Sequence, residues 1–599
     1  MDQLKKTNES TLGLISALLL VLGIFLLLWA WQDIKPAQSA GEPTSAASPS
    51  PADGSDIAAN EQINGNQAQT DDPSPVEAKP QPVDQAKKPS LTSRLGLAQP
   101  LQMALLNPTP PELEIAIQNW LDAQPKSSLI ADASEADLWL TTEPVDNPVA
   151  ERIYVPVKRF ASLDVEADPA QLLGLWLGGP KEGEQALVVT PDAAAGLFQL
   201  WGPPAEIEVV HSAEALAALL EENDSRLGVL PFDQLLPQVN ALAINGEDPT
   251  NNRFNLDTYP LVLRFYLAHQ PDAEQLAGSL RTYLKANGSA SNRDPAKLTS
   301  LIMTGVTAMS RVTAARMEAQ GYQYPAEEVG PELAAADLTH ISNEVPFFEG
   351  CQVNAAEGNV TLCSKPGYIE ALRAIGVDLI GLTGNHLNDF GRQASEQSMA
   401  FFSDEGIPTF GGGVNLAQSL EPLVMEHNGN RLVFLGANSF GPQLAWAEPD
   451  WPGSAPYDFD QMAIAIREAR EDLGADLVLL DMQWEESYDS LPIQSQLAGF
   501  QQLSSAGADI VTGVQSHVPQ AIGFGDGGLI LYGLGNFFFD QMWSLPTREG
   551  LIPRHTIYDG RHISTEILTT ILEDYAQPRW AAESERETLL NRIFAASGW

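Results

Sequence analysis

The sequence predicts an α/β protein that follows a membrane-spanning helix and an unstructured linker. Two observations lead to this prediction. From about Pro108 to the C-terminus, strand-like apolar segments alternate with helix-like segments, which is the pattern of βαβ units. Before Pro108, one long apolar run is followed by a stretch with few aromatic residues. Because a chain of 599 residues exceeds one ordinary core, more than one domain is expected.

The N-terminal apolar run is predicted to be a transmembrane helix. Residues 10–32 contain no charged side chain, and about 20 such residues span a bilayer. Lys5 and Lys6 precede the run, so the positive-inside rule places the N-terminus in the cytoplasm and the domains outside. A removed signal peptide is the alternative, but no Ala-x-Ala cleavage site follows the run. Residues 1–34 are therefore predicted to be a signal-anchor of a single-pass cell-membrane protein.

The composition of the next segment, and of the whole chain, limits the partners. Residues 35–107 are rich in Pro, Ala, Ser, Gln and acidic residues, which predicts a disordered linker. Over the whole chain, 78 Asp and Glu outnumber 33 Lys and Arg, for a formal charge of -45. Such a chain repels nucleic acid, so the membrane is the expected partner and nucleic acid is not. A solvated acidic surface and cation capture both explain the charge.

The two cysteines, Cys351 and Cys363, lie close together in a loop-like segment. Outside the cytoplasm we expect them to form a local disulfide, with two independent thiols as the alternative. A metal site at these cysteines is disfavoured because no histidine lies beside them.

Residues 108–296 are predicted to form a small mixed α/β domain. Ser212 fits the N-cap of a helix over 213–222. The segment RLGVLPFDQL, followed by YPLVLRFYL, resembles the C-terminal part of type-2 periplasmic solute-binding domains. The resemblance implies a solute-binding-like domain, which acts either as a ligand trap or as a degenerate platform. No anion-binding motif is present in it, so no ligand residues are carried over.

Residues 297–599 alternate in the same way and form the second predicted unit. Helices are expected over 366–375, 461–472 and 494–506, each followed by a strand-like run or by Gly. Asp559-Gly560 between two strand-like runs predicts a hairpin. Ser584 and Glu587 have the spacing of a capping box for a last helix.

Four polar segments in this unit each follow an apolar, strand-like run. They are Asn343-Glu344, Gly384-Asn385-His386, residues 513–517 (GVQSH) and Gly535-Asn536. Ligands bind outside the carboxyl ends of strands in open α/β sheets, so the four segments predict one shared site. A divalent cation needs carboxylate, imidazole or amide groups from several loops, and these segments supply such groups.

The residues of this predicted site have assigned roles. The predicted metal ligands are Glu344, Asn385, His386 and His517, with Asp389, Glu485, Glu486, Asn536 and Asp540 as further candidates. Bound Mn²⁺, Zn²⁺ or Mg²⁺ would activate water and stabilise charge on a phosphoryl or acyl oxygen. The predicted catalytic residues are His386 (general acid or ligand), Glu344 (ligand or base) and His517. Substrate contacts are assigned to Asn343, Asn536 and Trp484. Structural roles are the alternative: loop caps, hydrogen-bonded histidines and, for Trp484, the core.

The second unit resembles the bacterial capsule-synthesis CapA family from about Ser300 to Asn536. The resemblance rests on Asn343-Glu344 and on the segments AIGVDLIGLTGNHLNDFG, DMQWEESY, SAGADIVTGVQSHVPQ and YGLGNFFFDQ. This family is implicated in poly-γ-glutamate capsule assembly and looks like a branch of the calcineurin-like metallophosphoesterases. It implies a layered metallophosphoesterase-like α/β domain over 297–599. It also implies a role in capsule or exopolymer biosynthesis, with an anionic polymer or capsule-assembly proteins as partners.

Three residues depart from the family pattern. Val306 stands where the family has a metal-binding Asp, and Gln483 and Gln515 stand where it has His. Loss of these groups is expected to abolish a two-metal site. Three hypotheses stay open: residual metal-dependent hydrolase or transfer activity, a catalytically degenerate scaffold that binds polymer, and a solute-sensing module.

Overall fold

The computed structural model describes residues 100–183 and 186–599. No helix within these ranges is long and apolar enough to cross a membrane. The predicted anchor over 1–34 lies outside them, as does the predicted linker up to residue 99. The last residues of that predicted linker differ from the prediction, because Gln102–Ala104 form strand β1 with Met103 buried. The domain boundary between residues 296 and 297 stays a prediction.

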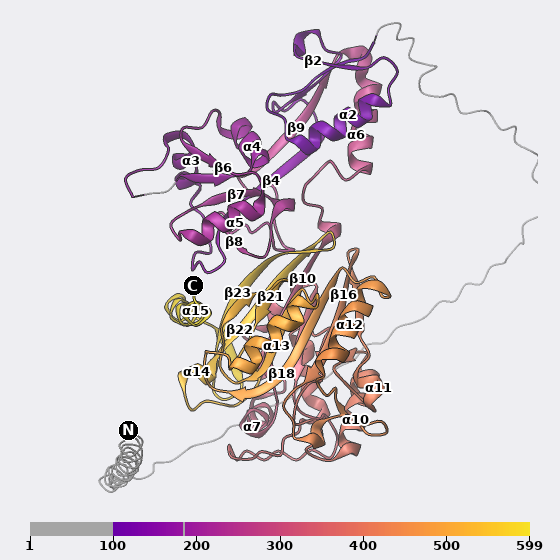
Figure 1. The fold of residues 1–599 in the computed structure, drawn as a ribbon, viewed down its shortest axis with the longest axis vertical. Helices are drawn as coiled ribbons and strands as arrows, with labels where there is room; N and C mark the ends of the chain where they lie inside the picture. The colour runs from indigo at the N-terminus through magenta and orange to yellow at the C-terminus, as the bar shows by residue number, and fades with distance from the viewer. Residues whose placement is uncertain (1–99, 184–185) are drawn as a thin grey trace, which may run out of the picture. The chain divides into compact units, whose positions relative to one another are not determined.

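The first sheet has nine strands in the order β2-β1-β3-β9-β4-β7-β5-β6, with β8 paired to β4 (Figure 1). Its strands are β1, β2 (Ser128–Ile130), β3 (Leu138–Thr141), β4 (Ala150–Arg159), β5 (Leu187–Val189), β6 (Ile207–Val209), β7 (Gly228–Pro231), β8 (Val239–Ala241) and β9 (Val262–His269). Its helices are α2 (Pro111–Asp122), α3 (Pro169–Gly178), α4 (Pro191–Trp201), α5 (Ala213–Glu222) and α6 (Glu274–Ala286). The long strand β4 joins the two halves of the sheet, because one end pairs with β9 and the other with β7.

Two further sheets are built from residues after 297. The first has the order β13-β12-β11-β10-β22-β23-β24 and the second β15-β16-β18-β19-β21-β20. Their strands are β10 (Leu298–Thr307), β11 (Leu338–Asn343), β12 (Leu379–Gly381), β13 (Thr409–Phe410), β22 (Glu549–Tyr558), β23 (Arg561–Glu573) and β24 (Gln577–Trp580), then β15 (Leu423–His427), β16 (Asn430–Asn438), β18 (Leu477–Ser487), β19 (Ile510–Ser516), β20 (Ile522–Phe524) and β21 (Leu529–Leu531). A small pair, β14 (Gly412–Gly413) and β17 (Gly453–Ser454), stands apart from them.

The α-helices of this part are α7 (Arg311–Gln320), α8 (Gly330–Leu333), α9 (Ile369–Ala374), α10 (Arg392–Asp404), α11 (Leu416–Ser419), α12 (Phe459–Glu471), α13 (Gln494–Ser505), α14 (Leu545–Arg548) and α15 (Glu583–Ser597). Helices such as α7, α9, α12 and α13 cover the outer faces of the two sheets, whereas the last helix packs against the core that the sheets share. Alternation along the strands explains the layers. On β18, Leu479 belongs to the core shared by both sheets, whereas Leu480 packs in the core that includes α12 and α13. On β10, Met303 faces the shared core and Ile302 the core beside α7 and α9.

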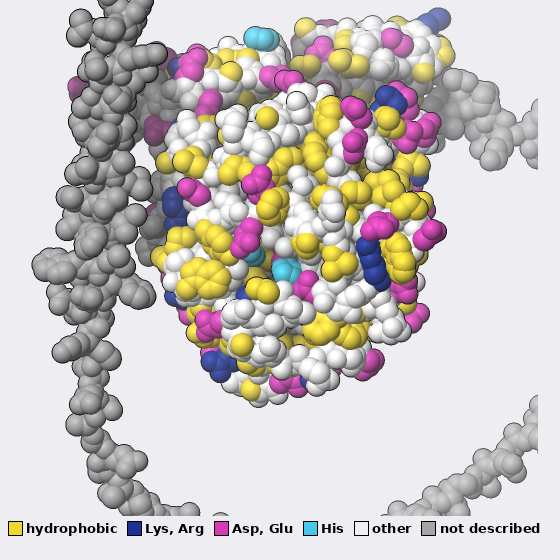
Figure 2. Space-filling view, turned by 60° about the horizontal axis from the view of Figure 1, so that its bottom comes forward, with side chains coloured by type: hydrophobic (Ala, Val, Ile, Leu, Met, Phe, Trp, Pro, Cys, Tyr) yellow, Lys and Arg dark blue, Asp and Glu magenta, His cyan; other side chains and the backbone are white. Residues whose placement is uncertain are grey.

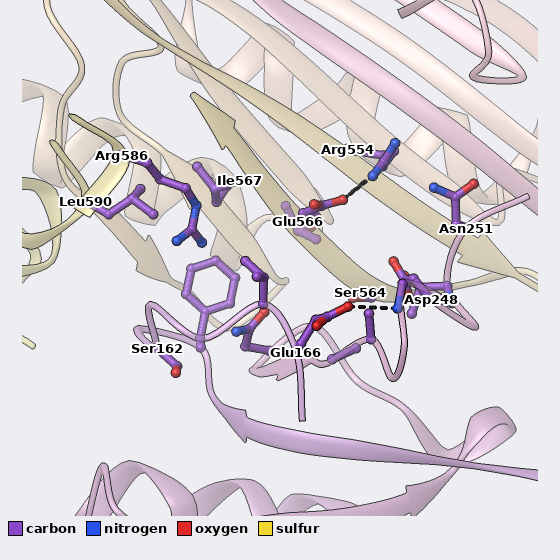
Figure 3. A pocket seen from close by; sticks show the side chains of 18 of the residues that line it. Ser162, Glu166, Asp248, Asn251, Arg554, Ser564, Glu566, Ile567, Arg586 and Leu590 are labelled. Carbon is purple, nitrogen blue, oxygen red and sulfur yellow. Dashed lines mark hydrogen bonds and ion pairs between the residues drawn. The ribbon is translucent and has the colours of Figure 1, made fainter. Parts of the chain in front are cut away.

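A cavity of about 290 Å³ lies where loops of the first sheet meet β22, β23 and α15 (Figure 3). Its charged side chains are already bonded. Arg554 pairs with Glu566, Glu166 accepts a hydrogen bond of 2.7 Å from the backbone N–H of Gly246, and Arg586 donates to the carbonyl of Leu163 at 2.8 Å. Of these three contacts, that of Arg586 on α15 with Leu163 joins the two parts of the chain before and after residue 297.

Local predictions can be compared with the observed elements. The helix over 213–222 and its Ser212 cap are confirmed, since the Ser212 hydroxyl accepts from the backbone N–H of Ala215 at 3.2 Å. The Asp559-Gly560 hairpin is confirmed, with both residues at positive φ. The predicted capping box of Ser584 and Glu587 is wrong. The last helix is capped two residues earlier, where Glu585 accepts from the backbone N–H of Ala582 at 2.8 Å.

Candidate functional site

The buried carboxyl group of Glu344 lies directly after β11. Its side chain is 1% exposed, and its Oε1 has no hydrogen-bond partner among the described residues. Burial raises its pKa to about 7. The charges of Glu486 and Asp389 raise it further, against the opposing effects of His386 and of a hydrogen bond from Gln483. This carboxyl group therefore changes charge near neutral pH.

The loop after β12 brings His386 to the same place. Gly384 permits this approach, because a Cβ on it would lie 2.3 Å from the Cα of Glu344. The Nδ1–H of His386 donates to Asp389 Oδ2 at 2.6 Å, and the backbone N–H of Leu362 donates to the same oxygen at 2.8 Å. Burial acts to lower the pKa of His386, but Asp389 and Glu344 outweigh it, so that pKa is raised. His386 is thus favoured in its protonated form.

Amide side chains join the strand ends of β18 and β19 to this loop. The Gln483 amide N–H₂ donates to Asn385 Oδ1 at 3.2 Å and also to Gln515 Oε1. Gln515 has a positive φ of 79°, where β19 is about to end. The two glutamines that replace the expected histidines therefore bond to each other and to a predicted metal ligand.

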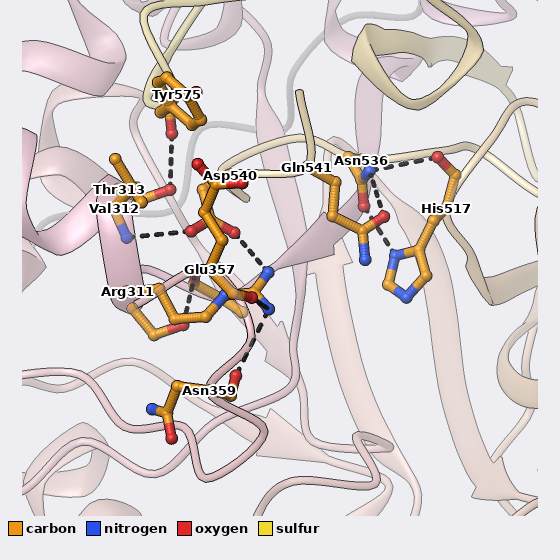
Figure 4. A network of polar contacts seen from close by, with 12 residues as sticks. Arg311, Val312, Thr313, Glu357, Asn359, His517, Asn536, Asp540, Gln541 and Tyr575 are labelled. Carbon is orange, nitrogen blue, oxygen red and sulfur yellow. Dashed lines mark hydrogen bonds and ion pairs between the residues drawn. The ribbon is translucent and has the colours of Figure 1, made fainter. Parts of the chain in front are cut away.

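His517 is buried after β19 and is held by Asn536 (Figure 4). Asn536 Nδ2 donates to the carbonyls of His517 and Thr547, so its Oδ1 accepts from His517 Nδ1–H at 2.9 Å. This leaves Nε2 as the unprotonated nitrogen, 3.9 Å from Glu486 Oε1. Burial lowers the pKa of His517 to about 4, so the ring is neutral at physiological pH.

A buried arginine lies beside these groups (Figure 4). Arg311, the first residue of α7, forms an ion pair with Asp540, and its guanidinium lies 4.5 Å from the ring centre of Phe539. Its Nη1 donates to the carbonyl of Glu357 at 2.9 Å. The Arg311 charge acts to lower the pKa of both His386 and His517. Sequence reasoning missed Arg311, whose only signal was its position soon after the end of β10.

The other predicted residues have different surroundings. Trp484 packs on the α13 side of the sheet, 5.4 Å from the Phe500 ring, because neighbours on a strand face opposite ways and Gln483 faces the site. Asn343 is fully buried and donates to the carbonyl of Val345 at 2.7 Å. Val306 lies in an apolar cluster with Phe539. Asp540 is engaged by Arg311, and Glu485 and Glu486 are exposed.

The residues present do not fit a metal centre with three or more protein ligands. Within the described ranges, no group of three or more His, Cys, Asp or Glu side chains could hold a metal ion. Val306 offers no donor atom, and the Gln483 amide N–H₂ is directed at Asn385 Oδ1, the oxygen that a metal would need. We therefore derive no chemical step through a metal.

The surroundings of the site are visible on one face of the molecule. Figure 2 shows histidine side chains in a hollow, with acidic and apolar side chains around it. Beside His517, Tyr488 lies at 5.3 Å and Trp543 lies 5.9 Å from Tyr488, ring centre to ring centre. Trp543 is 57% exposed, so an aromatic surface adjoins the buried polar groups. The predicted disulfide between Cys351 and Cys363 is present.

The fold and the site define an α/β protein with buried polar side chains at the strand ends of two packed sheets. Residues 300–541 match the family described as bacterial capsule synthesis protein PGA_cap. The predicted family is thereby confirmed.

Curated relatives agree with this assignment. The chain is 28% identical over 291 residues to the capsule biosynthesis protein CapA of Bacillus anthracis, covering 48% of this chain and 71% of that protein. It is 26% identical over 262 residues to the PGA biosynthesis protein CapA of Bacillus subtilis (strain 168), covering 44% of this chain and 68% of that protein.

Solved structures show only distant similarity. An ABC-type phosphate transport receptor from Vibrio cholerae is 13% identical, with a TM-score of 0.26, covering 32% of this chain and 95% of that chain. The NAD nucleotidase NadN of Haemophilus influenzae is 11% identical, with a TM-score of 0.29, covering 50% of this chain and 63% of that chain. Such low scores carry no argument, so the solute-binding-like and metallophosphoesterase-like folds stay predictions.

Proposed function

We propose that this protein takes part in the biosynthesis of a capsule or exopolymer of poly-γ-glutamate type, outside the cytoplasm and anchored by residues 1–34. The observation that carries the proposal is the family match over residues 300–541. The names of the relatives, capsule biosynthesis protein and PGA biosynthesis protein, support the same process. The anionic polymer and the other proteins of capsule assembly are the partners that this role requires.

Gene deletion tests this role. We expect deletion to reduce surface-bound γ-linked polyglutamate strongly, and the wild-type gene to restore it. A gene with Glu344→Gln and His386→Asn should fail to restore it, whereas Glu349→Gln, at an exposed neighbouring position, should succeed. An unchanged amount of polymer in the deletion strain would contradict the proposal.

Acid–base chemistry at the strand ends is the finer proposal. Glu344, with a pKa of about 7, is partly ionised at neutral pH and can accept a proton from an attacking water or amine. His386 is held by Asp389 and favoured in its protonated form, so it can donate a proton to the leaving group. Groups with such opposite roles are what hydrolysis or transfer at an amide bond needs.

An assay of polymer cleavage distinguishes catalysis by this site from the hypothesis of a non-catalytic scaffold. The purified full chain is incubated with γ-linked polyglutamate, and release of amino groups is followed with EDTA present. Parallel arms with Mn²⁺, Zn²⁺ or Mg²⁺ test the predicted metal. Activity that is lost in both Glu344→Gln and His386→Asn supports catalysis. Saturable polymer binding without turnover supports the degenerate scaffold instead.

A further inference from the structure

A second polar pocket lies beside the first sheet, on residues that the proposed function does not use. It has a volume of about 610 Å³ and is lined by Glu112 at the start of α2, Asp233 after β7, Arg152 on β4, and Asn292. Tyr558 and Arg561, from the β22–β23 hairpin, line it as well. Every charged side chain in this set is contributed by a different element.

Two carboxyl groups at this pocket, those of Glu112 and Asp233, form no ion pair with any described residue, whereas Lys297 and Asp559, which also line it, pair with each other at 3.0 Å. Glu112 and Asp233 line it, and Asp192 lies close enough for its charge to act on Asp233. None of the three forms an ion pair with a residue in the described ranges. Asp233 Oδ1 accepts only a hydrogen bond of 3.2 Å from Asn292 Nδ2. Burial, followed by the charge of Glu112, raises the pKa of Asp233 to about 7 and that of Asp192 to about 6.

The one buried arginine at the pocket, Arg152, forms no ion pair with these acids, although its charge acts to lower the pKa of Asp233 and Asp192. Arg152 is 3% exposed, and its Nη1 and Nη2 donate to the carbonyls of Glu151 and Ser289 at 2.8 and 3.1 Å. Its Nε has no partner in the part of the chain that the structure describes. The same holds for Asp192 Oδ1 and for the hydroxyl of Tyr154, which is fully buried. Buried polar groups are nearly always bonded, so among the described residues Asp192 Oδ1 lacks a donor and the Nε–H of Arg152 lacks an acceptor.

We propose that this pocket binds a small molecule through a protonated primary amine, which supplies the missing counter-ion of Asp233 and Glu112. An ammonium group donates three hydrogen bonds, and its positive charge can pair with the negative charge of these carboxylates. An anion such as phosphate is disfavoured, because the two terminal nitrogens of Arg152 are directed at backbone carbonyls and the carboxylates repel it. Lys297, another cation that lines the pocket, is already paired with Asp559. This site is independent of the capsule role and of Glu344.

Two classes of small molecule carry this group. A diamine or polyamine offers ammonium groups alone, whereas an α-amino acid adds a carboxylate. Arg561, whose Nη2 donates to the backbone carbonyl of Asp233 at 2.5 Å, could contact such a carboxylate at the same pocket. The amine is the shared chemistry, and the choice of probes separates the two sources.

Calorimetric titration of the purified full chain tests the proposal. The probes are putrescine, spermidine, glycine and glutamate, with succinate and inorganic phosphate as amine-free controls. We expect saturable binding of at least one amine and none of succinate or phosphate. Asp233→Asn and Glu112→Gln should each weaken amine binding at least tenfold. Glu114→Gln, on the same helix but outside the pocket, should bind as the wild type does.

The outcomes are separable. Binding by diamines alone assigns a polyamine site, and binding by amino acids alone assigns a zwitterion site. The proposal is overturned if no amine binds, if phosphate or succinate binds more tightly, or if Asp233→Asn and Glu112→Gln bind the amine unchanged. Circular dichroism of each variant shows that it is folded. None of these results bears on the capsule role, which is tested separately by loss of polymer in the deletion strain.

Discussion

The carboxyl group of Glu344 shows how one residue can couple the site to pH. It is 1% exposed, and its pKa is raised from 4.5 to about 7 by burial. A raised carboxyl pKa means that the folded chain holds this proton over a pH range where the unfolded chain has lost it. The contribution of this group to the free energy of unfolding is therefore highest below about pH 4.5, and it falls as the pH rises toward 7. The full difference is about 3 kcal/mol.

Replacement of Glu344 by Gln should remove this loss. We expect Glu344→Gln to have a free energy of unfolding near that of the wild type at pH 5 and up to ~3 kcal/mol above it at pH 8, because the amide never ionises. Urea unfolding of both proteins at the two pH values measures the difference. Glu349→Gln, at an exposed position, serves as the control and should follow the wild type. A variant that is less stable than the wild type at pH 8 would contradict the assigned burial cost.

At the level of elements, local sequence predicted those features that local chemistry determines. The Ser212 cap, the Asp559-Gly560 hairpin and the nearby cysteine pair each depend on a few adjacent residues. The shared location of the strand ends followed from the general placement of sites in α/β sheets. Trp484 was assigned to substrate, yet strand alternation turns it toward α13.

Long-range contacts explain what the sequence could not show. Arg311 reaches Asp540 across many residues, and no local pattern marks that pair. The last helix begins where Glu585 binds both Ala582 and Arg579, so an ion pair formed by the fold overrides the spacing of Ser584 and Glu587. The direction of the Gln483 amide likewise depends on two other segments.

The amide network between β18 and β19 should be convertible into a metal centre. The family resemblance implies Asp at 306 and His at 483 and 515, and these positions lie at the strand ends beside Glu344 and His517. We expect the triple variant Val306→Asp, Gln483→His, Gln515→His to bind Mn²⁺ or Zn²⁺ at least a hundredfold more tightly than the wild type. Two imidazoles would then replace the two amides, and a carboxylate would replace the apolar side chain of Val306.

Metal content by mass spectrometry after dialysis measures this gain. A matched control carries Gln541→His, beside Asn536 but outside the three replaced positions, and should bind metal no better than the wild type. Equal metal content in the triple variant and the wild type, with both folded, would show that the strand ends are not arranged for ligation.

The disulfide loop should support the site as well as the fold. Its carbonyls at Glu357 and Asn359 accept from Arg311, and Leu362 donates to Asp389, which holds His386. A bridge over a sequence separation of 12 contributes about 3 kcal/mol by restricting the unfolded chain. Cys351→Ser with Cys363→Ser should lower stability by about that amount and speed hydrogen exchange at Asp389. Exchange at Asp389 that stays at the wild-type rate would separate the loop from the site.

The whole molecule combines a strongly acidic chain with an apolar N-terminal segment. With a formal charge of -45, the body gains nothing from an anionic membrane surface, so any membrane attachment must come from the apolar run at residues 10–32. We expect the full chain to sediment with membranes and to resist extraction by high salt and by carbonate. Deletion of residues 1–34 should release it into the soluble fraction, because the deletion removes the apolar run.

Orientation follows from the same segment and can be measured on intact cells. We expect Lys5 and Lys6 to hold the N-terminus inside, so the folded body should be digested by protease added to cells whose wall has been removed. A tag placed before residue 1 should be protected until the membrane is opened. Replacing Lys5 and Lys6 by Glu, and adding lysines after Asp33, should weaken this asymmetry and leave part of the chain in the opposite orientation. Full protection of the body in the wild-type chain would place it in the cytoplasm, where it could not assemble a surface polymer.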